Sequence, residues 1–180
     1  ALLGQQQSVL IIGHNPDKAK DWNDKGAAYE AVDILDTDRL RQLFQLAERL
    51  FILNPPAPPS TDTIAVETRQ VNAILKAIEG LQLKKVVAAS TYGAQKGDDI
   101  ADLGVLYKLE QGLEKTGIPL AVIRSAYYMS NFDVSVEMVK NEGKLFTLYP
   151  ADFKLPMVAP EDIGEFAARL MTDERTGLFF

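Results

Sequence analysis

The chain has 180 residues, of which 47% are hydrophobic, and a formal net charge of −6 at pH 7. The length suits one domain, and the acidic balance argues against a nucleic-acid surface or a polybasic membrane patch. The chain has no cysteine and one histidine, His14, which excludes disulfides, thiolate catalysis and a Cys- or His-rich metal site. No apolar stretch approaches the roughly 18 residues of a membrane span, and no signal pattern opens the chain. We therefore expect a cytoplasmic protein with no metal, nucleic-acid or membrane partner.

The first part of the chain predicts short elements. Residues 1–5 look like the last turn of a helix, with Gly4 as its stop. Residues 8–12 are expected to form a buried strand, and residues 13–17 contain the Asn, Pro and Asp that are typical of a turn. A short polar helix is expected over residues 18–25.

A second strand is expected over residues 29–34, with a helix after it. Asp36 or Thr37 is expected to cap this helix, because such side chains accept hydrogen bonds from the free backbone N–H groups of the first turn. The core face of the helix consists of apolar residues at helical spacing, namely Leu40, Leu43, Phe44 and Ala47.

A third strand over residues 50–53 is followed by a proline-rich loop, residues 54–59. Proline lacks a backbone N–H, so this loop can form neither a helix nor a central strand. Ser60 or Thr61 is expected to cap the long helix that follows. Its apolar stripe comprises Ile64, Val71, Ile74, Leu75, Ile78 and Leu81.

The most informative strand spans residues 86–90, because its apolar residues do not alternate with polar ones. A strand that is apolar on both faces is covered on both faces, as in the interior of a parallel α/β sheet. Ligands of such sheets bind beyond the carboxyl ends of the strands. Ser90, Thr91 and Tyr92 end this strand and are therefore candidate site residues.

The alternation of helix and strand continues to the end of the chain. A helix is expected over residues 102–116, and the strand after it ends at Arg124, which needs an anion or a carbonyl as partner because the strand is buried. The remaining expected elements are a strand at 145–149, a helix that begins near Pro160 and a strand at 177–180. Strands that alternate with helices predict an α/β protein with a doubly wound parallel sheet.

Several motifs follow one another in a particular order: His14-Asn15-Pro16-Asp17-Lys18-Ala19, Val32-Asp33-Ile34-Leu35-Asp36, Asn54-Pro55-Pro56, Ser90-Thr91-Tyr92-Gly93-Ala94, Leu109-Glu110-Gln111, and Ile123-Arg124 leading to Tyr128-Met129-Ser130-Asn131. In this order they resemble the NmrA-like branch of the atypical short-chain dehydrogenase/reductases. The resemblance implies that residues 1–180 form a single NAD(P)-binding Rossmann-like domain. Members of the family include NAD(P)H-dependent quinone or azo reductases, and also redox-sensing regulators that bind the dinucleotide without turning it over.

The resemblance also implies a missing element. The family's chain begins one strand earlier, with a glycine-rich turn that holds the pyrophosphate at a helix N-terminus. This sequence has no G-x-x-G-x-x-G and is expected to lack that first strand. In the order 3-2-1-4-5-6 it is the middle strand, so its two neighbours must close up, recruit another segment or expose apolar edges. The C-terminal substrate lobe is expected to be truncated or minimal.

By resemblance, the turn after the first visible strand would hold the adenosine end of the cofactor. His14 stands where NADP-binding relatives often have an arginine for the 2′-phosphate, Lys18 would assist it, and Asn15 lies between them. No carboxylate ends this strand to bind a ribose 2′-hydroxyl, which favours NADP(H) over NAD(H). Asp33 and Ile34 would flank the adenine. His14 is equally typical of an ordinary polar loop, and Asp33 of a turn cap.

Asn54, Pro55 and Pro56 would border the nicotinamide, and Ser90, Thr91 and Tyr92 would lie beside it. The alternative for the first group is a stiff connector without a ligand. By position, Tyr127, Tyr128 and Met129 would line an apolar pocket for a flat substrate ring, although aromatic and Met residues at such a place are more often core.

No catalytic pair is established. Tyr92 and Lys96 match the superfamily's Tyr-x-x-x-Lys pattern, but they lie in a polar loop without helical geometry. Tyr107 is better placed, yet Gln111 replaces the lysine four residues on, and the adjacent Lys108 points about 100° away around the helix. Tyr107 and Lys108 are therefore weak catalytic candidates, and a boundary aromatic with a solvated lysine is the favoured alternative.

The function expected from the resemblance is an NAD(P)H-dependent oxidoreductase that reduces a quinone-like or other small electrophile. The first alternative is a non-catalytic NAD(P)-sensing regulator, and the second is a fold fragment without a cofactor site. A homodimer is a further hypothesis.

Overall fold

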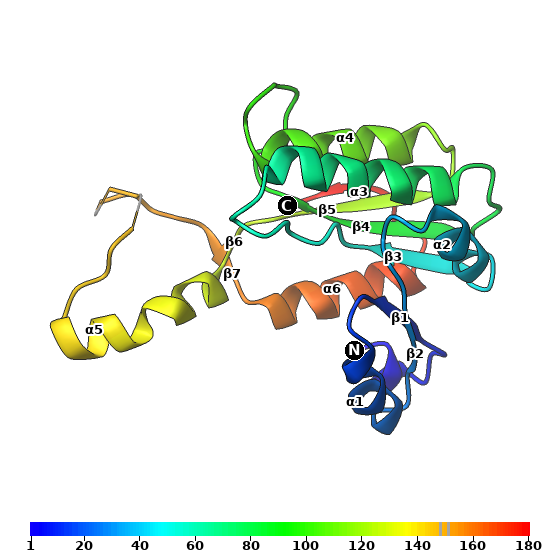
Figure 1. The fold of residues 1–180 in the computed structure, drawn as a ribbon, viewed down its shortest axis with the longest axis horizontal. Helices are drawn as coiled ribbons and strands as arrows, with labels where there is room; N and C mark the ends of the chain where they lie inside the picture. Colours follow the sequence, from blue (N-terminus) through cyan, green and yellow to red (C-terminus); the bar gives the residue numbers. More distant parts are fainter. Residues whose placement is uncertain (148, 151) are drawn as a thin grey trace.

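The computed structural model describes residues 1–147, 149–150 and 152–180, and its centre is a four-stranded parallel sheet (Figure 1). The strand order is β3-β4-β5-β8. The bounds of these strands are Arg49–Ile52 (β3), Lys85–Thr91 (β4), Leu120–Ser125 (β5) and Gly177–Phe179 (β8). The expected α/β fold with a parallel sheet is confirmed.

Strand β4 is covered on both faces, as its uninterrupted apolar sequence predicts. Val86 and Ala88 pack into the larger hydrophobic cluster, whereas Val87 packs into the smaller one. These three side chains are at most 1% exposed. Alternate residues of a strand point to opposite faces, so the two clusters are the two sides of one sheet.

Helices cover each face of this sheet. Figure 1 shows α3 (Thr63–Ile78) and α4 (Asp102–Glu114) on one side and α6 (Pro160–Thr172) on the other. The apolar residues expected to point inward from these helices do so, with Val71, Ile78, Leu109, Leu113 and Leu170 at most 1% exposed. Helical periodicity therefore predicted the core face of each helix correctly.

The helix caps were predicted in part. Asp36 caps α2 (Thr37–Phe44) by accepting a hydrogen bond from the backbone N–H of Arg39, as expected. The expected cap of α3 was wrong, because Asp62 accepts from the N–H of Ala65. The hydroxyl of Thr61 instead donates to the carbonyl of Pro58, at 2.7 Å, within the preceding turn.

The N-terminal strands form a separate two-stranded parallel sheet, in which β1 (Leu10–Gly13) pairs with β2 (Ala28–Ala31). The strand expected at 29–34 ends earlier, because Asp33 turns the chain by accepting a hydrogen bond from Leu35 N–H. Three short helices accompany this sheet: η1 (Leu3–Gln5), η2 (Pro16–Lys18) and α1 (Ala19–Asp24).

No hydrogen-bonded pairing joins β1 to β3 within the described parts of the chain. These are the two strands expected to flank the middle position of a Rossmann-like order. They neither close up into one sheet nor recruit another segment. Phe51 and Leu53, in and just after β3, are 43% and 57% exposed, so the apolar exposure expected beside this position is present.

An arm projects from the carboxyl side of β5 (Figure 1). It comprises β6 (Tyr127–Tyr128), η3 (Met129–Ser135), α5 (Val136–Glu142) and β7 (Met157–Val158), and β6 pairs with β7 in parallel. The strand expected at 145–149 is not formed at residues 145–147, and residue 148 lies outside the described residues. Among the described residues, no helix combines the length and apolarity needed to span a bilayer.

Candidate functional site

The carboxyl ends of β3, β4 and β5 meet at one edge of the central sheet. Ser90 is in register with Arg124 and Thr91 with Ser125, and the backbone N–H of Tyr92 donates to the carbonyl of Ser125 at 2.8 Å. Asn54 follows β3, which is in register with β4. The expected residues at the ends of these strands are therefore neighbours along one edge.

A buried polar network lies immediately behind this edge. The carboxylate of Glu110, on α4, accepts hydrogen bonds from the Ser90 hydroxyl at 2.5 Å and from Nε and Nη2 of Arg124 at 3.0 and 2.6 Å. The Glu110 side chain is 5% exposed and that of Arg124 is 16% exposed. This network links β4, α4 and β5. Arg124 was expected to need an anion or a carbonyl as partner, and the structure gives it an anion, Glu110.

The network fixes the charge of Arg124 and the orientation of the Ser90 hydroxyl. The hydrogen bond from Arg124 to the Glu110 carboxylate raises the pKa of the arginine, which holds its positive charge more firmly. The Ser90 hydroxyl is directed into the protein as a donor to Glu110. Thr91 and Tyr92 are the more exposed residues of this strand end.

Two buried polar atoms at the same edge have no partner among the described residues. They are Oδ1 of Asn54 and Oγ of Ser125, in residues that are 7% and 6% exposed. A buried polar atom without a partner costs about 1–3 kcal/mol. Such an atom at the end of a parallel strand is a candidate contact for a ligand.

The proline-rich loop beside Asn54 is held in place by α3. The carboxylate of Glu67, which is 9% exposed, accepts a hydrogen bond from Ala57 N–H at 2.9 Å. Pro55 and Pro56 lie between Asn54 and this anchored residue. The far end of the short segment is therefore anchored to α3, and its near end follows directly from β3.

The candidates for the adenosine end lie on the separate β1-β2 sheet. His14 and Lys18 are exposed, and the side chain of Asn15 caps η2 by accepting a hydrogen bond from Asp17 N–H. Asp33 makes the turn contact that was its alternative interpretation, and Ile34, next to it, is partly buried. No hydrogen-bonded strand pairing in the described residues joins this sheet to the central one.

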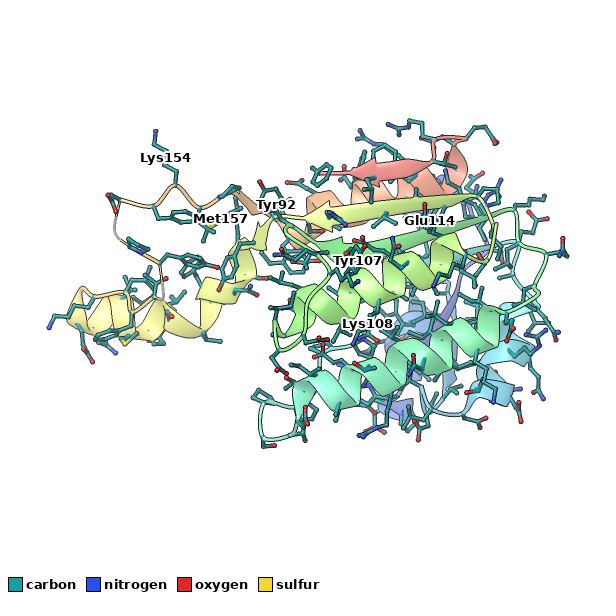
Figure 2. All side chains as sticks on the ribbon, turned by 90° about the horizontal axis from the view of Figure 1, so that it is seen from above. Tyr92, Tyr107, Lys108, Glu114, Lys154 and Met157 are labelled. Atoms are coloured by element: carbon teal, nitrogen blue, oxygen red, sulfur yellow. The ribbon has the colours of Figure 1, made fainter. Side chains whose placement is uncertain are left out.

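The weak catalytic candidates do not form a pair. Figure 2 shows Tyr107 and Lys108 on different sides of α4. Lys108 is exposed, and the amide of Gln111 donates to Glu114 at 3.2 Å. Residues 92–99, which contain the Tyr92-to-Lys96 pattern, form no helix, so this pattern lacks the helical geometry of a catalytic pair.

The substrate-pocket candidates begin the projecting arm. The Tyr127 ring lies 5.6 Å from the Phe132 ring and 5.7 Å from the Tyr149 ring, measured between centroids. Tyr128 pairs with Val158 in the β6-β7 ladder, and Met129 is 50% exposed. Tyr127 is therefore part of an aromatic cluster, whereas Met129 is accessible.

Sequence reasoning missed Glu110 and Ser125 as site residues. A sequence signal existed for Glu110, which follows Leu106 by four residues and precedes Leu113 by three. These positions share one helix face, so a carboxylate on the inward face required a buried cation. Ser125 gave no such signal, because one serine at the end of a strand is ordinary.

A family model described as the NmrA-like family matches residues 1–178. The chain belongs to the NmrA-like family.

One curated relative is 18% identical over 93% of this chain and 52% of its own length; it is the prestalk A differentiation protein A of Dictyostelium discoideum. The solved structures that are similar include a Citrobacter sp. triphenylmethane reductase complexed with NADP(H), at a TM-score of 0.80 and 20% identity over 95% of this chain and 59% of that one. An NADPH-dependent quinone oxidoreductase from Escherichia coli gives a TM-score of 0.77 and 20% identity over 99% of this chain and 60% of that one. The chain thus spans between half and two thirds of the length of these proteins. The structural similarity establishes the Rossmann-like fold.

Proposed function

We propose that this protein binds NADP(H) along the carboxyl edge of its sheets and reduces a quinone-like or other small electrophile. The observation that carries the proposal is the pair of unpartnered polar atoms, Asn54 Oδ1 just after β3 and Ser125 Oγ at the end of β5, on either side of β4 at one edge of the sheet. The proposal is also supported by the family and by similar structures whose names include NADP(H)-dependent reductases.

The edge of the central sheet suits the nicotinamide end of the cofactor. A carboxamide and a ribose each carry donors and acceptors, which would satisfy the Asn54 amide and the Ser125 hydroxyl. Pro55 and Pro56 have no N–H and present rigid carbonyl groups. Thr91 adds a hydroxyl at the end of β4, which lies between β3 and β5.

The preference for NADP(H) rests on the turn after β1. His14 and Lys18 are exposed there, and a 2′-phosphate favours cationic donors. His14 supplies charge only when it is protonated, so Lys18 is the permanent cation of the pair.

The chemistry requires little acid/base machinery from the protein. When bound, the reduced nicotinamide supplies the hydride, and the chain's residues bind, orient and exclude water. Tyr128 and Met129, at the start of the arm, would provide an apolar surface for a flat substrate ring. Tyr107 and Lys108 are not required for this step.

A second candidate function is a regulator that senses NAD(P) without consuming it. It is favoured by Gln111, which replaces the superfamily lysine and bonds to Glu114. The Ser90 hydroxyl donates its hydrogen bond inward to Glu110, which is also consistent with a sensor.

One experiment separates the two functions. NADPH absorbance is followed with the full-length protein and a panel of quinones, and NADPH binding is measured calorimetrically on the same sample. A reductase binds NADPH and oxidises it when a quinone is added, whereas a sensor binds it without turnover. Absence of NADPH binding at millimolar cofactor would contradict both functions.

A further inference from the structure

Arg124 has one guanidinium nitrogen that the buried network does not use. Nε and Nη2 are both bonded to Glu110, whereas Nη1 donates to no residue that the structure describes. Nη1 is also not among the fully buried, unpartnered atoms. Because the guanidinium carries five N–H donors in a rigid fork, the Nη1 donors are left for an external acceptor.

A pair of aromatic side chains lies beside the Arg124 guanidinium, with Phe180 next to it and Tyr92 next to Phe180. The Phe180 ring lies 5.9 Å from Cζ of Arg124, and the Tyr92 ring lies 6.4 Å from the Phe180 ring at an interplanar angle of 81°. Both aromatic residues are accessible, with Tyr92 61% and Phe180 79% exposed. We call Arg124, Tyr92 and Phe180 the Arg124 corner.

The position of the corner is fixed by the backbone. The Tyr92 N–H donates to the Ser125 carbonyl, which holds Tyr92 next to the end of β5. Phe180 directly follows Phe179, which is in register with Ile123, the neighbour of Arg124. The corner therefore lies at the same sheet edge as the proposed cofactor site.

We propose that the Arg124 corner is a substrate subsite that selects flat aromatic compounds bearing an anionic oxygen group, such as a sulfonate or an ionised hydroxyl. The substrate ring packs against Tyr92 and Phe180, and the oxygen accepts hydrogen bonds from Nη1. This inference rests on the proposed function, because it names the class of electrophile that the reductase takes.

The charge around the corner permits such a ligand. The Glu110 carboxylate is occupied by three donors from Ser90 and Arg124, so its charge is compensated locally. The chain's net charge of −6 repels anions at long range. That repulsion is largely screened beyond about 8 Å at physiological ionic strength. The test therefore uses a buffer of physiological ionic strength.

The test compares two ligands that differ in charge and undergo no redox chemistry, naphthalene-2-sulfonate and naphthalene-2-methanol. Their dissociation constants for the full-length protein without cofactor are measured by ligand-observed NMR titration. We expect the sulfonate to bind roughly tenfold to a hundredfold more tightly, because hydrogen bonds to charged groups are the stronger ones. Equal dissociation constants would overturn the proposal.

Two variants test whether Arg124 causes the preference for the sulfonate. Arg124→Lys keeps a cation for Glu110 but removes the fork, so sulfonate affinity is expected to fall to that of the alcohol, which stays unchanged. The control Arg169→Lys alters an exposed ion pair with Glu165 on α6 and should leave both ligands unaffected. A preference for the sulfonate that persists in folded Arg124→Lys contradicts the proposal.

Tyr92→Leu gives a test that does not depend on the stability of the Arg124 variant. It removes an exposed ring and is expected to weaken both ligands by the same factor. If the ligands bind as before, the aromatic part of the corner is wrong. Failure of the subsite proposal can be distinguished from failure of the proposed function. NADPH turnover without a preference for the sulfonate refutes the subsite alone, and a preference for the sulfonate without NADPH binding refutes the reductase alone.

Discussion

Replacing Glu110 by Gln tests whether the buried network stabilises the carboxyl edge. The amide can still accept from the Ser90 hydroxyl, but it leaves the Arg124 charge without a counter-ion in a site where the arginine side chain is 16% exposed. Removing one partner of a buried ion pair costs about 3–5 kcal/mol. For a chain of this size that corresponds to a decrease in Tm of roughly 6–20 °C.

The assay is thermal and urea unfolding followed by far-ultraviolet circular dichroism. Fluorescence of Trp22 is less suitable, since this residue belongs to α1 beside the two-stranded sheet. The matched control is Glu165→Gln, whose carboxylate lies 3.8 Å from Arg169 with both side chains about two thirds exposed. An exposed pair of this kind contributes less than about 1 kcal/mol.

A double variant, Glu110→Leu with Arg124→Met, compares the loss of both charges of the ion pair with the loss of one. Replacing both charges by apolar groups of similar volume is often close to neutral, so we expect the double variant to be more stable than Glu110→Gln. An unfolding free energy for Glu110→Gln within about 1 kcal/mol of wild type would refute the reasoning, because the network would then have no structural role.

Two further predictions concern cofactor choice and pH. Lys18→Gln should reduce the ratio of NADPH to NADH affinity roughly fivefold, whereas Lys20→Gln, whose partner is the exposed Asp24, should not; equal effects on both cofactors would exclude a 2′-phosphate contact at Lys18. Hydrogen bonds from Arg175 and from Lys85 lower the pKa of Asp173, so its contribution to stability is present above the usual Asp pKa of about 3.9 and is lost as the pH falls through the lower folded value. Asp173→Asn should therefore lower Tm at pH 7, and the difference from wild type should shrink below about pH 4; a difference that does not depend on pH would contradict this.

The parts of the fold that depend on local pattern could be predicted from the sequence. The apolar run of β4 predicted a strand buried on both faces, and Val87 and Ala88 are fully buried. The Asp36 cap was also predictable, because its partner is three residues away. The α3 cap was missed because Ser60, Thr61 and Asp62 are all suitable in composition, and only the turn at Pro58 decides among them.

For contacts between residues far apart in the chain, the sequence predicted only the type of partner and not its identity. The sequence indicated that Arg124 needs an anion or a carbonyl as partner, but only the packing of α4 against β4 and β5 shows that the partner is the Glu110 carboxylate. The direction of the Ser90 hydroxyl follows from the same contact. The unpartnered atoms of Asn54 and Ser125 belong to no pattern, since burial without a partner is a property of the folded chain.

The most direct test of the account is calorimetric titration of NADPH into the full-length protein and its Asn54→Leu variant. Asn54 is buried with an unpartnered Oδ1, so leucine, whose side chain branches in the same way, removes a polar group without removing a hydrogen bond within the protein. We predict saturable NADPH binding to wild type, and a variant that is at least as stable but binds NADPH about tenfold more weakly. A variant that loses stability and retains full NADPH affinity, or a wild type that binds no NADPH, would contradict the claim that this edge is the cofactor site.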